Sequence, residues 1–369
     1  MTTETKQGGP RAATPCLAGL CAGLMRRDLA PGAPWLSTLP VLLGAVLALL
    51  LASGMALAVF YDPRAAQASL RFIALEVPAG WIMRGYHVTG AGLGFVLLYV
   101  HLFRMLLTRG YRGPAAAGWM LWVTLLAALL LAGWLGFALN GGLGGYWSLI
   151  DAISASLALS GPAGGVAMWF FGGAPGDGTL ARLLVFHAVL GVAAAGLLWL
   201  ACAATRQARP APAGRMVAFW PVYAAQAFAA LALLALVFAL LMCFAPHWGQ
   251  GAQSQLPASS LAVPAAVSYP WYLTPLAGLT ALFPGAGGHA LAVIAAAAAL
   301  YALPWLDRSG GGAPGGLYRA LTWLLGLDVL GLGLSAVCPL AAGLQILLFV
   351  WFFIHFLVLT PAVTAMEAA

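Results

Sequence analysis

The sequence contains little charge. Of its 369 residues, 16 are lysine or arginine and nine are aspartate or glutamate, whereas 63% are hydrophobic and the mean hydropathy is +0.96. A soluble protein cannot bury so large an apolar fraction in its core. The composition therefore excludes a water-soluble globular protein and indicates an integral membrane protein.

The sequence also lacks the cysteine spacings of metal and cofactor attachment sites. Its five cysteines include no pair separated by two residues. Nothing in their distribution indicates zinc, an iron–sulfur cluster or the attachment motif of c-type haem. The first 35 residues contain no apolar core followed by a cleavage-like site, so we expect no secretory signal peptide there, and the first spanning helix would direct insertion.

Eight apolar stretches are long enough to cross about 30 Å of hydrocarbon, which takes roughly 20 residues of helix. They begin near Leu36, Gly85, Pro114, Leu183, Met216, Ala286, Ala320 and Leu344. We therefore predict an all-α integral membrane bundle of about eight transmembrane helices. Residues 246–270 are rich in proline, serine and glycine, and we expect them to form a loop at the membrane surface.

The basic residues predict an orientation. When the 16 are sorted by alternating loops, four fall on one side and the other 12 on the side of both termini. The four are Arg64, Arg71, Arg84 and Arg182. By the positive-inside rule, both termini are expected in the cytoplasm. The net charge of +7 is then explained by topology and does not indicate a nucleic-acid partner.

Three histidines in apolar segments are candidate ligands. His87 and His101 are fourteen residues apart, close to four helical turns, so they face the same way roughly 21 Å apart along the axis. This geometry suits two stacked haems, with one of the two histidines at each haem. Because two imidazoles hold a six-coordinate haem iron, each haem would need a second ligand from another segment. His187 lies in a later segment, and Ala201 stands fourteen residues after it. The alternative is that these histidines only form hydrogen bonds between helices.

Sequence motifs around these histidines resemble a known family. Residues 80–90 and 98–104 resemble the second transmembrane helix of cytochrome b from cytochrome bc complexes, and residues 179–187 resemble the start of its fourth helix. Further motifs follow in that family's order and approximate spacing, at residues 219–223, 244–246 and 270–272 and at Asp328. The likeness runs from about residue 30 to the C-terminus and identifies the chain as a divergent member.

The resemblance implies a haem b near the outer face of the membrane. His87 and His187 would ligate its iron, and Arg84 and Arg182 would neutralise its propionates. Glycines such as Gly54 and Gly136 would let the flat macrocycle approach the helices, although small residues also serve helix packing without a cofactor.

The inner haem site departs from the family's pattern. His101 and Arg104 match a haem ligand and a propionate partner, but the second ligand is replaced by Ala201, whose methyl cannot coordinate iron. The inner haem is then missing, five-coordinate on His101, or held by a ligand from elsewhere. His101 as an interhelical histidine without haem is the other alternative.

The quinone sites depart from the pattern as well. The family's Pro-Glu-Trp-Tyr motif corresponds to Tyr269-Pro270-Trp271-Tyr272, so Pro270 replaces the glutamate that takes a proton from quinol. General-base catalysis needs a titratable group, and Tyr272, with Tyr269 as the alternative, is the candidate for it. At the inner quinone site, Arg206 and Ala227 replace a histidine and an aspartate, and an arginine does not relay protons at ordinary pH.

Two functions from different classes follow. The first is an electron-carrying cytochrome b subunit of a respiratory quinol–cytochrome c reductase-type complex, with an iron–sulfur protein and a c-type cytochrome as partners. The second is a diverged anchor or partner subunit with one haem or none and no complete quinone cycle. In either case we expect a multi-pass protein of a bacterial inner membrane, or an equivalent energy-transducing membrane, that forms a homodimer or pairs with another cytochrome b.

The resemblance also predicts a domain organisation. Residues 1–35 would form a cytoplasmic segment, residues 36–210 a haem-binding four-helix domain, and residues 211–369 a domain similar to the C-terminal part of cytochrome b. The number of haems, the type of quinone and the electron acceptor do not follow from the sequence.

Overall fold

The computed structural model describes residues 28–29, 36–157, 161–173, 177–208, 217–283, 285–338 and 340–368. Most of the expected N-terminal segment, residues 1–35, thus lies outside the described residues. The described chain is built from α-helices and one two-stranded antiparallel sheet of β1 (Asp28–Leu29) and β2 (Val217–Ala218).

The helices follow one another with short connections. They are α2 (Leu39–Phe60), α3 (Ala66–Leu75), α4 (Gly80–Leu107), α5 (Ala116–Leu139), α6 (Leu143–Leu157), α7 (Gly161–Phe171), α8 (Asp177–Gln207), α9 (Ala224–Phe244), α10 (Thr274–Thr280), α11 (Ala286–Leu306), α12 (Gly316–Ser335), α13 (Ala342–Ile354) and α14 (Thr360–Met366). Single helical turns occupy Leu36–Thr38, Pro63–Ala65, Gly113–Ala115, Phe219–Tyr223, Ala252–Gln255, Trp271–Leu273 and His355–Leu359.

Eight helices in the described part of the chain are long and apolar enough to cross a membrane, as the sequence predicted. They span Leu36–Phe60, Gly80–Leu107, Gly113–Leu139, Gly178–Gln207, Trp220–Phe244, Gly287–Leu306, Gly316–Ser335 and Ala342–Met366. The second, fourth and seventh begin four or five residues before the predicted starts, because each helix continues toward its N-terminus through an arginine, namely Arg84, Arg182 and Arg319. The eight-helix prediction is confirmed, and the orientation of the termini stays a prediction.

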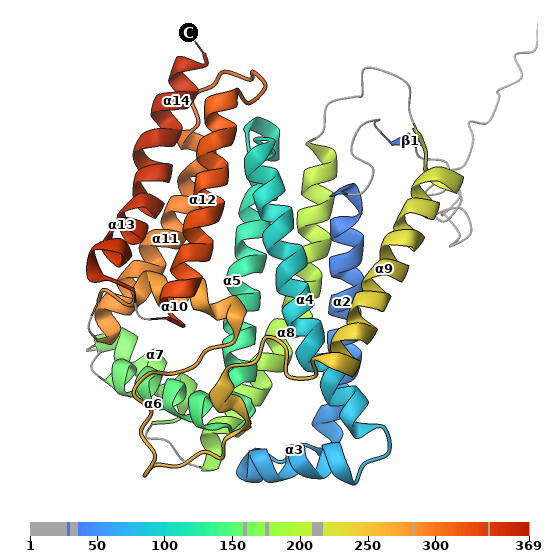
Figure 1. Ribbon diagram of the computed structural model, residues 1–369, viewed down its shortest axis with the longest axis vertical. Helices are drawn as coiled ribbons and strands as arrows, with labels where there is room; N and C mark the ends of the chain where they lie inside the picture. The colour runs from blue at the N-terminus through green and yellow to red at the C-terminus, as the bar shows by residue number, and fades with distance from the viewer. Residues whose placement is uncertain are drawn as a thin grey trace, which may run out of the picture.

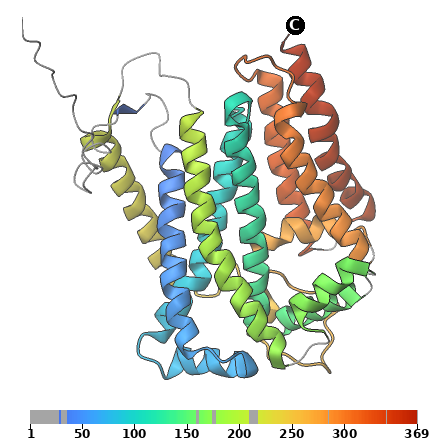
Figure 2. The same ribbon diagram turned by 180° about the vertical axis from the view of Figure 1, so that it is seen from behind.

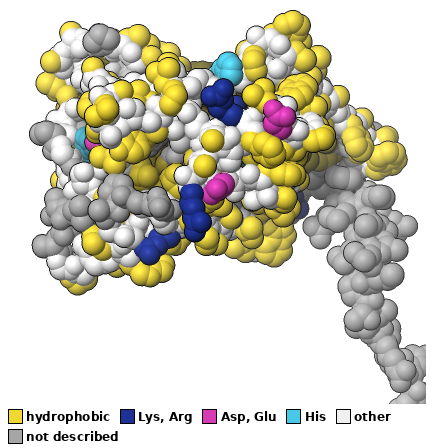
Figure 3. Space-filling model, turned by 90° about the horizontal axis from the view of Figure 1, so that it is seen from below, with side chains coloured by type: hydrophobic (Ala, Val, Ile, Leu, Met, Phe, Trp, Pro, Cys, Tyr) yellow, Lys and Arg dark blue, Asp and Glu magenta, His cyan; other side chains and the backbone are white. Residues whose placement is uncertain are grey.

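The helices form two groups. Helices α2, α4, α5 and α8 pack into one bundle, in which α5 lies against α8 and α2 against α4, and helices α10 to α14 form the second group beside α5 (Figure 1). Helices α3, α6 and α7 lie across one end of the molecule in both views (Figures 1 and 2), and we call it the α3 end. Seen from there, a few charged side chains are scattered among hydrophobic ones (Figure 3).

Helix α9 packs against α2 and α4, on the side of the bundle away from α10 to α14 (Figure 1). The chain then returns across the α3 end to reach α10. The second predicted domain, residues 211–369, thus contributes helices to both sides of the first bundle. The division at residue 211 stays a prediction.

Glycine is required where α3 meets α4. A Cβ on Gly80 would overlap the carbonyl oxygen of Ile73, which is fully buried. Only a residue without a side chain lets α3 fold back so closely on the first turn of α4. This turn fixes α3 across the end of the bundle and places the first turns of α4, which carry His87, just inside it.

A buried polar cluster joins the two groups at the end opposite α3. The Arg109 guanidinium lies 3.5 Å from Asp307 Oδ2, contacts Glu367 and lies 4.1 Å above the Tyr318 ring. Tyr111 donates a hydrogen bond of 2.8 Å to Asp307 Oδ2. Burial raises the pKa of Asp307, but hydrogen bonds from Ser309 and Tyr111 and the charge of Arg109 outweigh it, so the net pKa is lowered.

Candidate functional site

The two predicted haem ligands face each other near the α3 end. His87 on α4 and His187 on α8 have ring centroids 5.9 Å apart, with the ring planes inclined by 66°. Because a bond from imidazole nitrogen to a metal is about 2 Å long, two rings on opposite sides of one metal ion have centroids roughly 6 Å apart. The separation therefore fits two imidazoles that would hold one iron between them.

One ring nitrogen of each imidazole contacts a backbone carbonyl oxygen of a neighbouring helix. Nδ1 of His87 lies 3.1 Å from the carbonyl oxygen of Leu50, and Nδ1 of His187 lies 2.9 Å from that of Ala132. A carbonyl oxygen only accepts, so these contacts assign the proton to Nδ1 and leave the lone pair on Nε2. Metal-ligating histidines typically have this arrangement, in which the second nitrogen is fixed by a backbone carbonyl.

Ser53 on α2 adds a second contact to His87. Its hydroxyl donates to the carbonyl oxygen of Leu49 at 2.7 Å and lies 3.2 Å from Nδ1 of His87. A serine in an apolar helix gives no sequence signal for this role, because hydroxyls often bond their own helix backbone.

The predicted glycines lie beside the two rings. A Cβ on Gly54 would be 3.0 Å from Cε1 of His87, and a Cβ on Gly136 would be 3.1 Å from Cε1 of His187. These distances leave no room for a side chain unless an imidazole moves. Gly54 and Gly136 thus fit the expected role of small residues at this site.

A cavity of about 180 Å³ lies between these side chains. His87, His187, Gly54, Gly136 and Arg84 all line it. Arg84 donates a hydrogen bond of 3.4 Å to Oδ1 of Asn140, whose amide in turn donates to the carbonyl oxygen of Ser254 at 2.7 Å. The guanidinium is therefore placed where it can bind an acidic group, and Asn140 holds it there.

Arg182 is placed differently from Arg84. Its guanidinium donates to the carbonyl oxygen of Trp169 on α7 at 3.3 Å and packs against Gly172, and it does not line the cavity. The sequence motif predicted the same role for both arginines. Arg182 differs because it contacts α7, and the sequence alone does not give the position of that helix.

Two residues of the predicted quinone region line the same cavity, namely Pro270 and Tyr272. The Tyr272 ring stacks on Phe95 with centroids 4.2 Å apart, and Tyr99 donates a hydrogen bond of 2.8 Å to its backbone carbonyl. Burial raises the pKa of Tyr272 above that of an exposed tyrosine, so its phenol keeps its proton at neutral pH.

The other predicted quinone residues lie outside the cavity. The Trp271 ring packs 6.1 Å from Tyr99 and 6.0 Å from Trp248. Arg206 is exposed in the last turn of α8, at the opposite end of the bundle from His87. Among the described residues that line the cavity, none is an aspartate or a glutamate.

Around His101, about four helical turns along α4 from His87, the side chains are closely packed; we call this position the His101 level. His101 is buried, and its ring centroid lies 4.1 Å from that of Trp122 on α5. Trp122 donates a hydrogen bond of 3.1 Å to the Thr205 hydroxyl, which donates to the carbonyl oxygen of Ala201 at 2.7 Å. Arg104, one turn beyond His101, is half-buried. The residues at this level therefore do not fit a haem as those at the His87 level do.

The comparisons with known proteins cover most of the chain. Residues 34–208 match a family model described as cytochrome b/b6/petB, and residues 257–357 match one described as cytochrome b(C-terminal)/b6/petD. Cytochrome b of Allochromatium vinosum is 30% identical over 286 residues, which cover 70% of this chain and 69% of the relative. Cytochrome b of Rhodospirillum rubrum is 26% identical over 340 residues, 87% of this chain and 84% of the relative.

A solved structure has the same fold. A chain of "Hyperthermophilic respiratory Complex III" superposes with a TM-score of 0.83, covering 92% of this chain and 94% of that chain at 22% identity. The architecture of Figures 1 and 2 is therefore shared despite the divergence in sequence.

Proposed function

The chain belongs to the cytochrome b family, and on that premise we propose that it binds haem b between His87 and His187 and carries electrons as a membrane subunit of a respiratory bc-type complex. Membership of the family implies haem b binding. The paired imidazoles, each with Nδ1 on a backbone carbonyl, are the observation that carries the proposed position of the haem.

The chain's own residues would hold and orient the cofactor. His87 and His187 offer Nε2 to the iron, since Leu50 and Ala132 fix the opposite nitrogens. Arg84 supplies a positive charge for a propionate, and the surface of the cavity is mostly apolar. Haem, when bound by two histidines, supplies one-electron transfer without an open position for oxygen.

The haem content of the purified full-length protein tests this proposal. We expect a low-spin spectrum of bis-imidazole type that is lost in both His87→Ala and His187→Ala. His289→Ala is the matched control, because His289 is exposed at the start of α11 and should leave the spectrum unchanged. A low-spin spectrum that survives both substitutions would show that the iron is bound elsewhere.

A second function, that of a partner subunit without a complete quinone cycle, is favoured by one observation. In the part of the chain that the structure describes, no carboxylate lines the cavity that contains Pro270 and Tyr272. Oxidation of a quinol needs a group that accepts its protons, and a buried tyrosine with a raised pKa is a poor one. In this function the chain exchanges electrons with other redox subunits.

Family membership and topology support the setting of both functions. We place the chain in a bacterial inner membrane or an equivalent energy-transducing membrane, with both termini in the cytoplasm and the His87 site near the outer face. An iron–sulfur protein and a c-type cytochrome are the proposed partners. A homodimer, or a heterodimer with a more complete cytochrome b, is the proposed assembly.

A further inference from the structure

We propose that the inner haem site of this chain has been converted into a packed aromatic plug made by Trp122, so that the protein holds a haem at the His87 level only. The inference deepens the proposed function and rests on it. It concerns the level of His101, where family members would hold a second haem. Four observations support it.

The first observation is the register of Trp122. On α5 it lies fourteen residues before Gly136, which is the spacing that separates His101 from His87 on α4. Fourteen residues are close to four turns and roughly 21 Å of rise, so Trp122 occupies nearly the same face of α5 as Gly136, one haem level further along. A large indole thus stands where the first site has a glycine.

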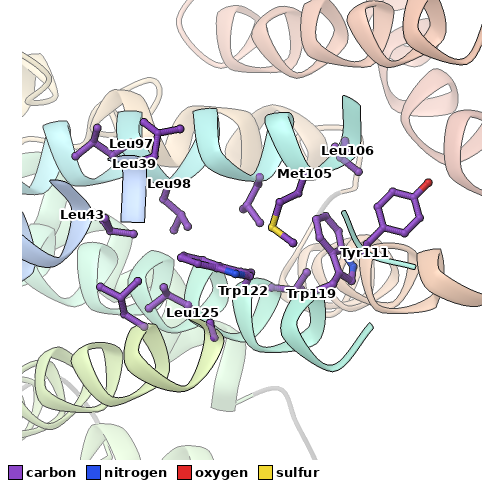
Figure 4. Close-up of a cluster of buried hydrophobic side chains, with 14 of the residues drawn as sticks. Leu39, Leu43, Leu97, Leu98, Met105, Leu106, Tyr111, Trp119, Trp122 and Leu125 are labelled. Carbon is purple, nitrogen blue, oxygen red and sulfur yellow. The ribbon is translucent and has the colours of Figure 1, made fainter. Parts of the chain in front are cut away.

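The second observation is the contact itself. At the first site the ring facing His87 is another imidazole, with centroids 5.9 Å apart. At the second level the ring facing His101 is the Trp122 indole, with centroids 4.1 Å apart. Two rings in van der Waals contact leave no space for a macrocycle between them. Figure 4 shows the indole of Trp122 extending from α5 toward α4, near Leu98.

The third observation is the anchor on α8. The hydrogen bond from Trp122 to Thr205 and the bond from Thr205 to the carbonyl oxygen of Ala201 tie the indole to the helix that would supply the missing ligand. A Cβ on Gly118 would lie 2.8 Å from the Thr205 hydroxyl, so α5 and α8 approach closely here. A buried indole needs a partner for its N–H, and Thr205 provides it.

The fourth observation is the burial of the surrounding side chains. Trp122 is 1% exposed, and Ala201, Leu98 and Leu125 are fully buried in the same hydrophobic core. Protein interiors are packed at the density of organic crystals, so a side chain added at a fully buried position meets atoms already there. The loss of the ligand at residue 201 and the gain of the indole at residue 122 therefore act together.

Two explanations of the missing haem, the plug at Trp122 and the loss of the ligand at residue 201 alone, predict different results for Ala201→His. If only the ligand were missing, Ala201→His would restore a second low-spin haem. With the indole in place, we expect Ala201→His to gain none, whereas the double variant Trp122→Gly/Ala201→His gains one. The matched control is Trp119→Gly/Ala201→His. Trp119 is an equally buried tryptophan one turn away on α5, but its indole donates to the carbonyl oxygen of Leu300 on α11, away from His101.

The experiment measures haem b per polypeptide and the low-spin electron paramagnetic resonance signals of the purified full-length protein. We expect one haem in the wild type, in His101→Ala, in Ala201→His and in the Trp119 control, and two in the Trp122 double variant. Two haems in the wild type, loss of haem in His101→Ala, or a second haem in Ala201→His alone would overturn the plug. So would a Trp122 double variant that keeps the first haem and gains none.

Failure of the proposed function gives a different pattern. A wild type without haem contradicts the His87–His187 site. The Trp122 double variant in a His87→Ala background still tests the plug, because its signal would come from His101 and residue 201 alone. A haem gained there supports the plug, and the absence of haem in a protein that keeps its wild-type thermal stability contradicts it.

Discussion

The imidazole rings of His87 and His187 face each other with centroids 5.9 Å apart, and each ring rests on a glycine of a neighbouring helix. Four helices thus contribute to one position: α4 and α8 supply the rings, while α2 and α5 supply the backbone carbonyls and the glycines. Because each contact fixes a ring in orientation, the site depends on the packing of the whole bundle.

The glycine contacts predict that Gly136→Val abolishes or weakens haem binding. The new side chain would displace the His187 ring, and overpacking of this kind costs about 1–3 kcal/mol. That cost corresponds to roughly a five- to 150-fold loss of affinity. Haem titration of the apoprotein measures the change. The control is Gly196→Val on α8, where a Cβ would meet nothing within 4 Å, and a loss of equal size there would contradict the prediction.

The different positions of the two arginines predict different effects on the haem. Arg84→Gln removes a positive charge from the cavity, and we expect the reduction potential of the haem to fall by tens of millivolts, since about 59 mV corresponds to a tenfold change for one electron. Arg182→Gln removes a charge that bonds Trp169 outside the cavity and should shift the potential less. Redox titration of both variants measures the two shifts. Equal shifts in the reduction potential would contradict our placement of Arg84, and not Arg182, beside the haem.

Because no carboxylate lies among the described residues of the cavity lining, we predict that the chain does not oxidise quinol by itself. We expect the protein, purified with its partner subunits but without a second, more complete cytochrome b, to show little or no quinol–cytochrome c reductase activity that outer-site inhibitors block. Activity is measured as reduction of cytochrome c by a short-chain quinol, with a complete bc complex as the positive control. A robust, inhibitor-sensitive turnover would show that another group accepts the protons.

The polar cluster at the end opposite α3 predicts a pH-dependent contribution to stability. The lowered pKa of Asp307 means that its carboxylate stabilises the fold above the pKa of the unfolded state, near 3.9, and that this contribution is lost as the pH falls through the lower folded-state pKa. Asp307→Asn should therefore destabilise the protein at neutral pH by about 1–3 kcal/mol. The difference from wild type should disappear in strong acid.

Thermal unfolding of the purified protein, followed from neutral pH down into strong acid, measures this effect. The control is Asp62→Asn, because Asp62 is exposed and its carboxylate accepts a hydrogen bond from the backbone N–H of Arg64 in the turn that follows it. An Asp307→Asn variant as stable as wild type at neutral pH would show that Arg109 and Tyr111 do not depend on this carboxylate.

The sequence determined the helices and the residue spacings along each of them. In lipid a chain satisfies its backbone hydrogen bonds within each spanning segment, so eight apolar stretches necessarily become eight helices. The same regularity places His87 and His101 on one face of α4 without knowledge of any neighbour. The family motifs survive because they are local, and they identified the family correctly.

The tertiary structure decided which side chains share a space. That His187 meets His87, that Arg84 turns into the cavity while Arg182 bonds α7, and that the Trp122 indole lies against His101 all depend on the rotation and spacing of helices far apart in sequence. Helix interfaces in membranes are held by close packing of side chains, since lipid is as apolar as the helices themselves. The packing partner of each residue is therefore a property of the assembled bundle, and no single segment specifies it.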